Sequence, residues 1–181
     1  MKRRQVLPAL AAGFTSAAAA HEGDAFITQW RDSFLKHWKV TAEYTIAVAD
    51  AMPEDAYTFK PTDAQRNFAE QMVHLGRANV AYMTAFGIVQ PPAPPAPTET
   101  SKKVVRAYLT ASFDFVTEVI TKASTKELAR TDLKLGRLPA HSATDLCMRA
   151  YMHTAHHRGQ LVVYLRLKGI VPPTWAFEPT V

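Results

Sequence analysis

The chain has 181 residues, 48% hydrophobic and 20% charged, which is typical of one globular domain and excludes a disordered or fibrous protein. Its one cysteine, Cys147, excludes an internal disulfide framework and a cysteine-rich zinc module. The formal net charge of +5 falls to +2 without residues 1–20, because residues 21–181 hold 18 Lys and Arg (21 − 3) against 16 Asp and Glu. So small a surplus, with no basic run after residue 20, argues against a nucleic-acid partner.

Residues 1–20 have the features of an export signal. A basic start (KRR) precedes a mildly apolar stretch, and three alanines before His21 fit a small-residue cleavage site. The paired arginines resemble the twin-arginine export pattern, and an ordinary secretory signal is the alternative. The apolar stretch is shorter than the roughly 20 residues of a membrane-spanning helix, so we expect no stable membrane insertion. The sequence predicts an exported, periplasmic protein whose mature part, residues 21–181, is a single domain.

Apolar residues at helical spacing predict a first helix over residues 24–52. Asp24 is expected to cap its start, and Pro53 to stop it. A second helix is predicted over residues 67–87, where Asn67 and the glutamate three residues later form a capping box. Both helices carry an apolar stripe on one face, which indicates packing against other helices.

Residues 91–97 read PPAPPAP and cannot be helical. We expect a stiff, extended spacer across the end of the molecule; a proline-rich ligand for a partner domain is the alternative. A third helix is predicted to start near Ser101. A fourth, capped by Ser142 and Asp145, is predicted to run to Lys168, just before a glycine. Four amphipathic helices without a strand pattern predict an all-α four-helix bundle.

The placement of the histidines points to chemistry. His153 and His157 are four residues apart, one turn of the predicted fourth helix, and therefore share a face. His74 lies on the predicted second helix among small residues. Inward-facing imidazoles are costly without partners, and a divalent ion would supply one partner for all three. The alternative is that they are core histidines bonded to hydroxyl or carbonyl groups, because a bare H-x-x-x-H pair is a weak metal signal.

Two segments resemble the DinB/YfiT-like family of proposed metalloproteins. Residues 153–173, reading HTAHHRGQLVVYLRLKGIVPP, look like the closing helix of that family. Residues 57–79, with Lys60-Pro61 and later His74-Leu75, resemble its entry into the second helix. The resemblance covers about residues 25–175.

The resemblance implies an up-down-down-up bundle with a metal held by one histidine of the second helix and two of the fourth. In this chain these are His74, His153 and His157. Three further side chains are expected near the ligands without binding the metal: Tyr44, His156 and Tyr164. The metal is a divalent transition metal, and zinc, nickel and iron all accept imidazole ligands.

Characterised relatives include transferases and isomerases that use a low-molecular-weight thiol. The resemblance therefore implies a metal-dependent transferase or hydrolase that acts on an unidentified small molecule through an open three-histidine site. Export argues against a thiol, since such thiols are mainly cytoplasmic, and favours water as the nucleophile. The alternatives are a non-catalytic, stress-associated metal-binding bundle and a scaffold that recruits partners through PPAPPAP. Family members frequently dimerise through helix faces, which makes a homodimer an expectation.

Overall fold

The computed structural model describes the backbone of residues 11–175 and the side chains from residue 22 onward. Within this part the chain is helical, and its one β pairing is an isolated bridge between Leu133 and His141. The elements are α1 (Ala11–Ala51), the short 3₁₀ helix η1 (Glu54–Ala56), α2 (Phe68–Thr84), α3 (Lys102–Lys122), α4 (Thr125–Leu128) and α5 (Ala143–Leu167). The predicted all-α class is confirmed.

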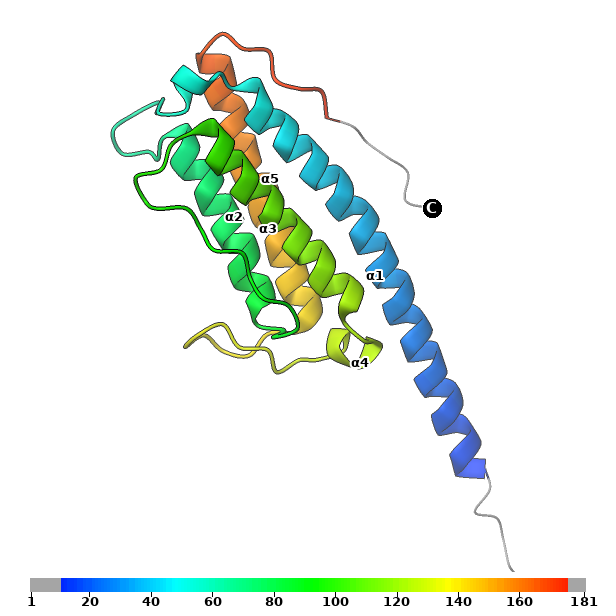
Figure 1. Cartoon of the computed structure of the whole chain (residues 1–181). Coiled ribbons are helices and arrows are strands. Elements are labelled where there is room, and N and C mark those ends of the chain that lie inside the picture. The colour runs from blue at the N-terminus through cyan, green and yellow to red at the C-terminus, as the bar shows by residue number, and fades with distance from the viewer. Residues whose placement is uncertain (1–10, 176–181) are drawn as a thin grey trace, which may run out of the picture.

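The four long helices form a bundle in which α1 and α5 run one way and α2 and α3 run the other (Figure 1). Each of α2 and α1 packs against both α3 and α5. Because α2 and α3 are parallel, the chain between them, residues 85–101, returns along the bundle and carries the PPAPPAP segment (Figure 1). The up-down-down-up order is therefore confirmed, and residues 91–97 contain no helix.

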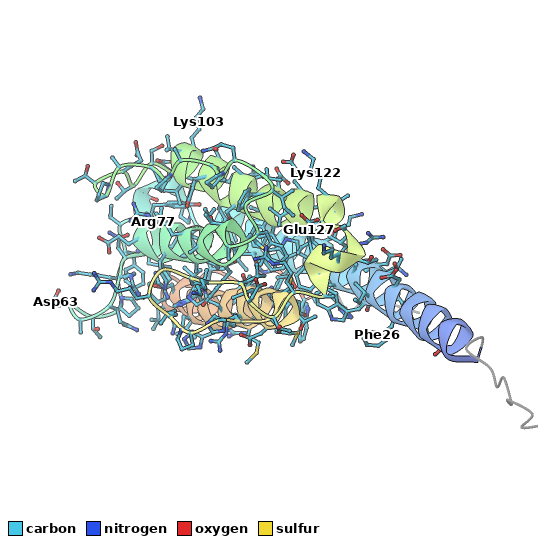
Figure 2. All side chains as sticks on the ribbon, turned by 90° about the horizontal axis from the view of Figure 1, so that it is seen from below. Phe26, Asp63, Arg77, Lys103, Lys122 and Glu127 are labelled. Atoms are coloured by element: carbon cyan, nitrogen blue, oxygen red, sulfur yellow. The ribbon has the colours of Figure 1, made fainter. Side chains whose placement is uncertain are left out.

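The first helix starts earlier than predicted. It begins at Ala11, and Asp24 lies inside it, where its carbonyl accepts a hydrogen bond from the Thr28 hydroxyl at 2.9 Å. The stretch before Asp24 is rich in alanine, the strongest helix former, and its two glycines, Gly13 and Gly23, do not interrupt the helix. This longer α1 extends past the end of the bundle, and the exposed Phe26 lies near where it leaves (Figure 2).

Residues 1–10 of the predicted export signal lie outside the described residues, and residues 11–20 form the first part of α1. Export and the boundary at residue 21 stay predictions. None of the helices in the described part is long and apolar enough to cross a bilayer.

The other helix starts follow the predicted caps. The Asn67 side chain accepts from the Glu70 N–H, and Glu70 accepts from the Asn67 N–H, each at 2.8 Å. Ser101 caps α3, and Ser142 caps α5 by accepting from the Asp145 N–H at 3.0 Å. These caps satisfy N–H groups that have no partner inside a helix, and so they fix where α2 and α5 begin.

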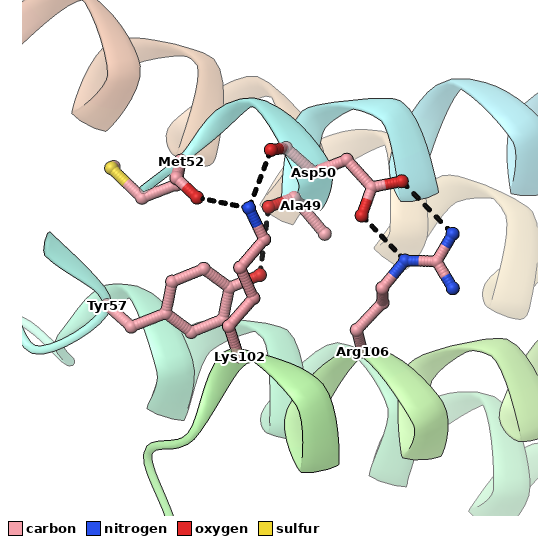
Figure 3. A network of polar contacts seen from close by, with 6 residues as sticks. All are labelled: Ala49, Asp50, Met52, Tyr57, Lys102 and Arg106. Carbon is pink, nitrogen blue, oxygen red and sulfur yellow. Dashed lines mark hydrogen bonds and ion pairs between the residues drawn. The ribbon is translucent and has the colours of Figure 1, made fainter. Parts of the chain in front are cut away.

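One end of the bundle is tied by a polar network (Figure 3). The Lys102 ammonium donates to the carbonyls of Asp50 and Met52, each at 2.7 Å, and the Tyr57 hydroxyl donates to the carbonyl of Ala49 at 2.8 Å. Arg106 forms a two-pronged pair with the Asp50 carboxylate at 2.6 and 3.0 Å. The last carbonyls of α1 thus find their partners in Tyr57, just after η1, and in Lys102, the first residue of α3.

Candidate metal centre

Three imidazoles from two helices meet between α2 and α5. The ring centres of His74 and His153 are 5.1 Å apart, those of His74 and His157 are 4.6 Å apart, and those of His153 and His157 are 4.2 Å apart. One ring nitrogen of each lies within 4.8 Å of the others. The structure therefore brings together the three histidines that the sequence singles out, while their role as metal ligands stays a prediction.

Hydrogen bonds from α5 to α2 and to Arg66, just before α2, fix the alignment that brings the histidines together. Toward one end, the Thr154 hydroxyl donates to the Asn79 amide oxygen at 3.1 Å, and both side chains are fully buried. Toward the other end, the Tyr164 hydroxyl donates to the backbone carbonyl of Arg66 at 2.9 Å. His74 and His157 lie between these two bonds and His153 directly precedes Thr154, so the antiparallel pair of helices cannot slide without breaking both hydrogen bonds.

The three imidazoles are neutral at pH 7. Burial above all, together with the neighbouring imidazoles and Arg66, lowers the pKa of His153 and of His157 from 6.5 to about 4. Burial, followed by the charge of Arg66, also lowers the pKa of His74. A neutral imidazole keeps a lone pair on one ring nitrogen, which is the form that binds a metal.

A buried glutamine that the sequence analysis missed holds one of the rings. The Gln71 amide nitrogen lies 2.7 Å from Nδ1 of His157 and donates to the Gln160 amide oxygen. The same oxygen lies 3.2 Å from Nδ1 of His157. With Nδ1 held by these amides, Nε2 is the nitrogen of His157 left for an ion. Gln71 precedes His74 by three residues and shares its face of α2, which is the one sequence signal that points to it.

The residues present fit a divalent transition metal. Nδ1 of His153 is buried and has no hydrogen-bond partner within the described residues. An orphaned buried nitrogen is costly, and a metal ion would satisfy it. Three imidazoles are the ligand set of open zinc sites, and imidazole also suits nickel and iron. His157 has its other nitrogen held by amides, as metal-bound histidines usually do.

The side chains expected beside the ligands have different roles. His156 is exposed, its ring centre is 4.9 Å from that of His157, and its Nε2 lies 3.0 Å from the Gln160 amide nitrogen. The Tyr44 ring packs 4.7 Å from the Arg158 guanidinium instead of on the imidazoles. Tyr164 uses its hydroxyl on the Arg66 carbonyl. The structure thus places His156 beside the cluster and records no contact of either tyrosine with it.

A solvent-open cavity of about 410 Å³ adjoins His74. It lies between α2 with the residue before its cap and the end of PPAPPAP with the residues that follow, and its lining residues are Arg66, Glu70, Val73, His74, Arg77, Ala96, Pro97 and Glu99. Because His74 belongs both to this cavity and to the cluster, a small molecule in the cavity would lie beside the three imidazoles.

A family model identifies the superfamily of this chain, and further comparisons find a relative in sequence and relatives in fold. The family model described as the DinB superfamily matches residues 37–161. The uncharacterized protein YrdA of Bacillus subtilis strain 168 is 27% identical over an alignment of 154 positions that covers 80% of this chain and 87% of that protein. Two crystal structures of DinB-like proteins share the fold. The one from Bacillus cereus ATCC 10987 has a TM-score of 0.69 at 20% identity and covers 78% of this chain and 94% of its own. YjoA from Bacillus subtilis has a TM-score of 0.63 at 19% identity and covers 80% and 99%.

Proposed function

The chain belongs to the DinB superfamily, and we propose that it binds one divalent transition-metal ion through His74, His153 and His157 and uses it on a small molecule. One observation carries the proposal: three ring nitrogens lie within 4.8 Å of one another. The ligand set is three histidines without a carboxylate or a thiolate. Structural zinc sites usually have four protein ligands, so three ligands favour a site that is open to a further molecule.

The chemistry follows from neutral ligands. When bound, an ion held by three imidazoles would keep its full 2+ charge and would lower the pKa of a water or thiol beside it. Gln71 and Gln160 hold His157 in one orientation. Asn79 and Thr154 close the space on one side with a buried hydrogen bond. The cavity beside His74 leaves room for a substrate. This arrangement favours a metal-dependent transferase or hydrolase.

The ligand assignment is tested by metal content. Elemental analysis of the purified chain, before and after reconstitution, is expected to show about one transition-metal ion per chain, as three ligands can supply. His74→Ala and His153→Ala are each expected to lose most of this metal, because two imidazoles remain. His156→Ala is the matched control, because its ring lies beside the cluster, and it should keep the metal. No metal in the reconstituted wild type, or equal retention in all three variants, contradicts the proposal.

Turnover separates an enzyme from a metal-binding protein. A screen of small electrophiles with water, and separately with thiols, should find a reaction that His74→Ala abolishes while His156→Ala retains it. Metal uptake without any turnover would instead favour a non-catalytic metal-binding bundle.

A further inference from the structure

The cavity beside His74 contains two guanidinium groups. Arg66 lies just before the start of α2, and Arg77 lies three residues after His74 on α2. Figure 2 labels Arg77 on this helix. Arg77 donates to the carbonyl of Pro95 at 3.3 Å, which holds it at the wall formed by the crossing segment. Neither arginine belongs to an ion pair within the described residues.

The two carboxylates of the same cavity are already engaged. Glu70 and Glu99 each accept a hydrogen bond from the backbone N–H at a helix start, at 2.8 and 2.7 Å. A carboxylate is favoured at a helix N-terminus, where the unsatisfied N–H groups carry partial positive charge. These two glutamates are therefore explained by capping, whereas the two arginines have no carboxylate partner in the part of the chain that the structure describes.

Hydrogen bonds to the backbone at Arg66 hold this residue close to the histidines. The buried Tyr164 hydroxyl bonds its carbonyl, and Asn67, the next residue, is fixed by the capping box of α2. Its charge lowers the pKa of all three imidazoles, so the guanidinium lies within electrostatic reach of the cluster.

A positive group beside a cation site has an energetic consequence. Three neutral ligands leave a bound divalent ion with its whole charge, and a guanidinium within electrostatic reach repels that ion. An anion between them would be attracted by both charges, and guanidinium binds carboxylate and phosphate well because its N–H groups match their oxygens. A neutral substrate would leave the repulsion in place.

We propose that the cavity lined by Arg66, His74 and Arg77 binds a small-molecule anion, a carboxylate or a phosphate, whose charged group lies between the two guanidinium groups and whose remainder reaches the three imidazoles. This names the substrate class of the site, and it rests on the proposed function for the presence of the ion. The cavity of about 410 Å³ suits a small metabolite.

The test uses the full chain loaded with Co²⁺, whose visible absorption responds to changes around the ion. Acetate and inorganic phosphate are titrated as probes, and acetamide is the neutral match for acetate. Both anions should change the spectrum with saturation, and acetamide should not. In the Arg66→Gln, Arg77→Gln double variant, anion affinity should fall about tenfold, which corresponds to about 1.4 kcal/mol. Arg137→Gln, on an exposed loop away from the cavity, should leave it unchanged.

A second readout separates an anion site from a merely structural role of Arg66. Without an anion, Arg66→Gln should bind Co²⁺ more tightly than the wild type, because a repelling charge is removed. Equal anion affinity in wild type and double variant, or equal binding of acetate and acetamide, overturns the inference.

Calorimetric titration of phosphate into the metal-free chain tells the two proposals apart. If the chain takes up no Co²⁺ but binds phosphate in a way that needs both arginines, the anion site stands and the metal proposal falls. If it takes up Co²⁺ and the arginines have no effect on either anion, the reverse holds.

Discussion

His157 is the ligand whose orientation the surrounding side chains control most tightly. An imidazole that binds a metal through Nε2 carries its proton on Nδ1 and needs an acceptor there. Gln160 Oε1 is 3.2 Å from that nitrogen, and the Gln71 amide is 2.7 Å from it. Either amide can offer its oxygen, since rotation by 180° exchanges the oxygen and nitrogen ends. Gln71 is only 3% exposed, so water cannot easily replace it.

Replacing Gln71 should therefore weaken metal binding without removing a ligand. We expect Gln71→Leu to raise the dissociation constant for Zn²⁺ or Co²⁺ about 10- to 100-fold, the usual effect of losing a group that orients a ligand. Gln71→Glu should restore the affinity, because a carboxylate accepts from Nδ1 and adds negative charge near the ion. Competition with a chromophoric chelator measures both constants. Unchanged affinity in Gln71→Leu would show that Gln71 serves packing alone.

The residues that the sequence predicts and those it misses differ in the kind of signal they leave. His153 and His157 are one turn apart, and the helical period alone places them together. Whether His74 faces them depends on how two helices that are distant in the sequence align. For this chain, the prediction that it does comes from the family resemblance. Gln71 has no motif of its own, and its role emerges only once α5 lies against α2. The wrong start of the first helix has a similar origin, because Asp24 is a good capping residue but alanines before it continue the helix.

At the scale of elements, α2 and α3 approach closely at Gly76. A Cβ added there would lie 2.9 Å from a ring carbon of Tyr108 and 3.3 Å from the Ser112 hydroxyl, and both side chains are buried. Gly159, inside α5, is the opposite case, because an added Cβ meets nothing within 4 Å. The same residue type thus has a packing reason in one helix and none in the other.

The two glycines should respond to alanine with opposite signs. Gly159→Ala is expected to raise the free energy of unfolding by about 0.5–1 kcal/mol, because alanine favours the helix and the added methyl is unobstructed. Gly76→Ala gains the same helix preference but forces Tyr108 to shift in a packed interface, which costs about 1–3 kcal/mol. We expect a net loss of stability. Urea denaturation of the metal-free chain measures both, and equal changes in the two variants would contradict a close α2–α3 contact.

The predicted caps of α2 and α5 are confirmed because they are local, whereas the contact between α2 and α3 is not encoded locally. Asn67 and Glu70 form their box within one turn, so four residues of sequence suffice to identify it. The closeness at Gly76 depends on two parallel helices joined by a long crossover, and a lone glycine in a helical pattern does not reveal it. The short helix α4, for which no helix is predicted from the sequence, begins with a second capping box of Ser124 and Glu127.

The lowered pKa values of the imidazoles between α2 and α5 make the stability of the whole molecule depend on pH. His153 and His157 have a pKa of about 4 when folded and near 6.5 when unfolded. Between these pH values the unfolded chain binds more protons than the folded chain. As far as these two groups determine it, the free energy of unfolding is therefore highest above about pH 6.5 and declines as the pH falls toward 4. Part of each pKa shift comes from repulsion between the two rings. The two histidines together therefore lower the stability by less than twice the effect of one of them.

Stability of the metal-free protein should therefore fall with acidity in a defined window. Between about pH 7 and pH 4, we expect the free energy of unfolding to drop by on the order of 3 kcal/mol from these two groups. Urea denaturation at several pH values in the presence of a chelator measures the decrease. The His153→Gln, His157→Gln double variant should show a flatter profile over the same window. An equally steep profile in that variant would assign the acid sensitivity to other groups.

The polar network that ties the end of α1 to the beginning of α3 also affects which ligands the cavity beside His74 can accept. The cavity beside His74 lies between α2 and residues 96–99, which lead into the first turn of α3 that Lys102 ties to α1. Both walls are held at one end by a helix cap: α2 by Asn67 and Glu70, and the crossing segment by the hydrogen bond from the Ser101 N–H to Glu99. We therefore expect the cavity to select ligands by their fit to a preformed shape. Molecules larger than the opening should not bind, and smaller molecules should bind without a conformational change.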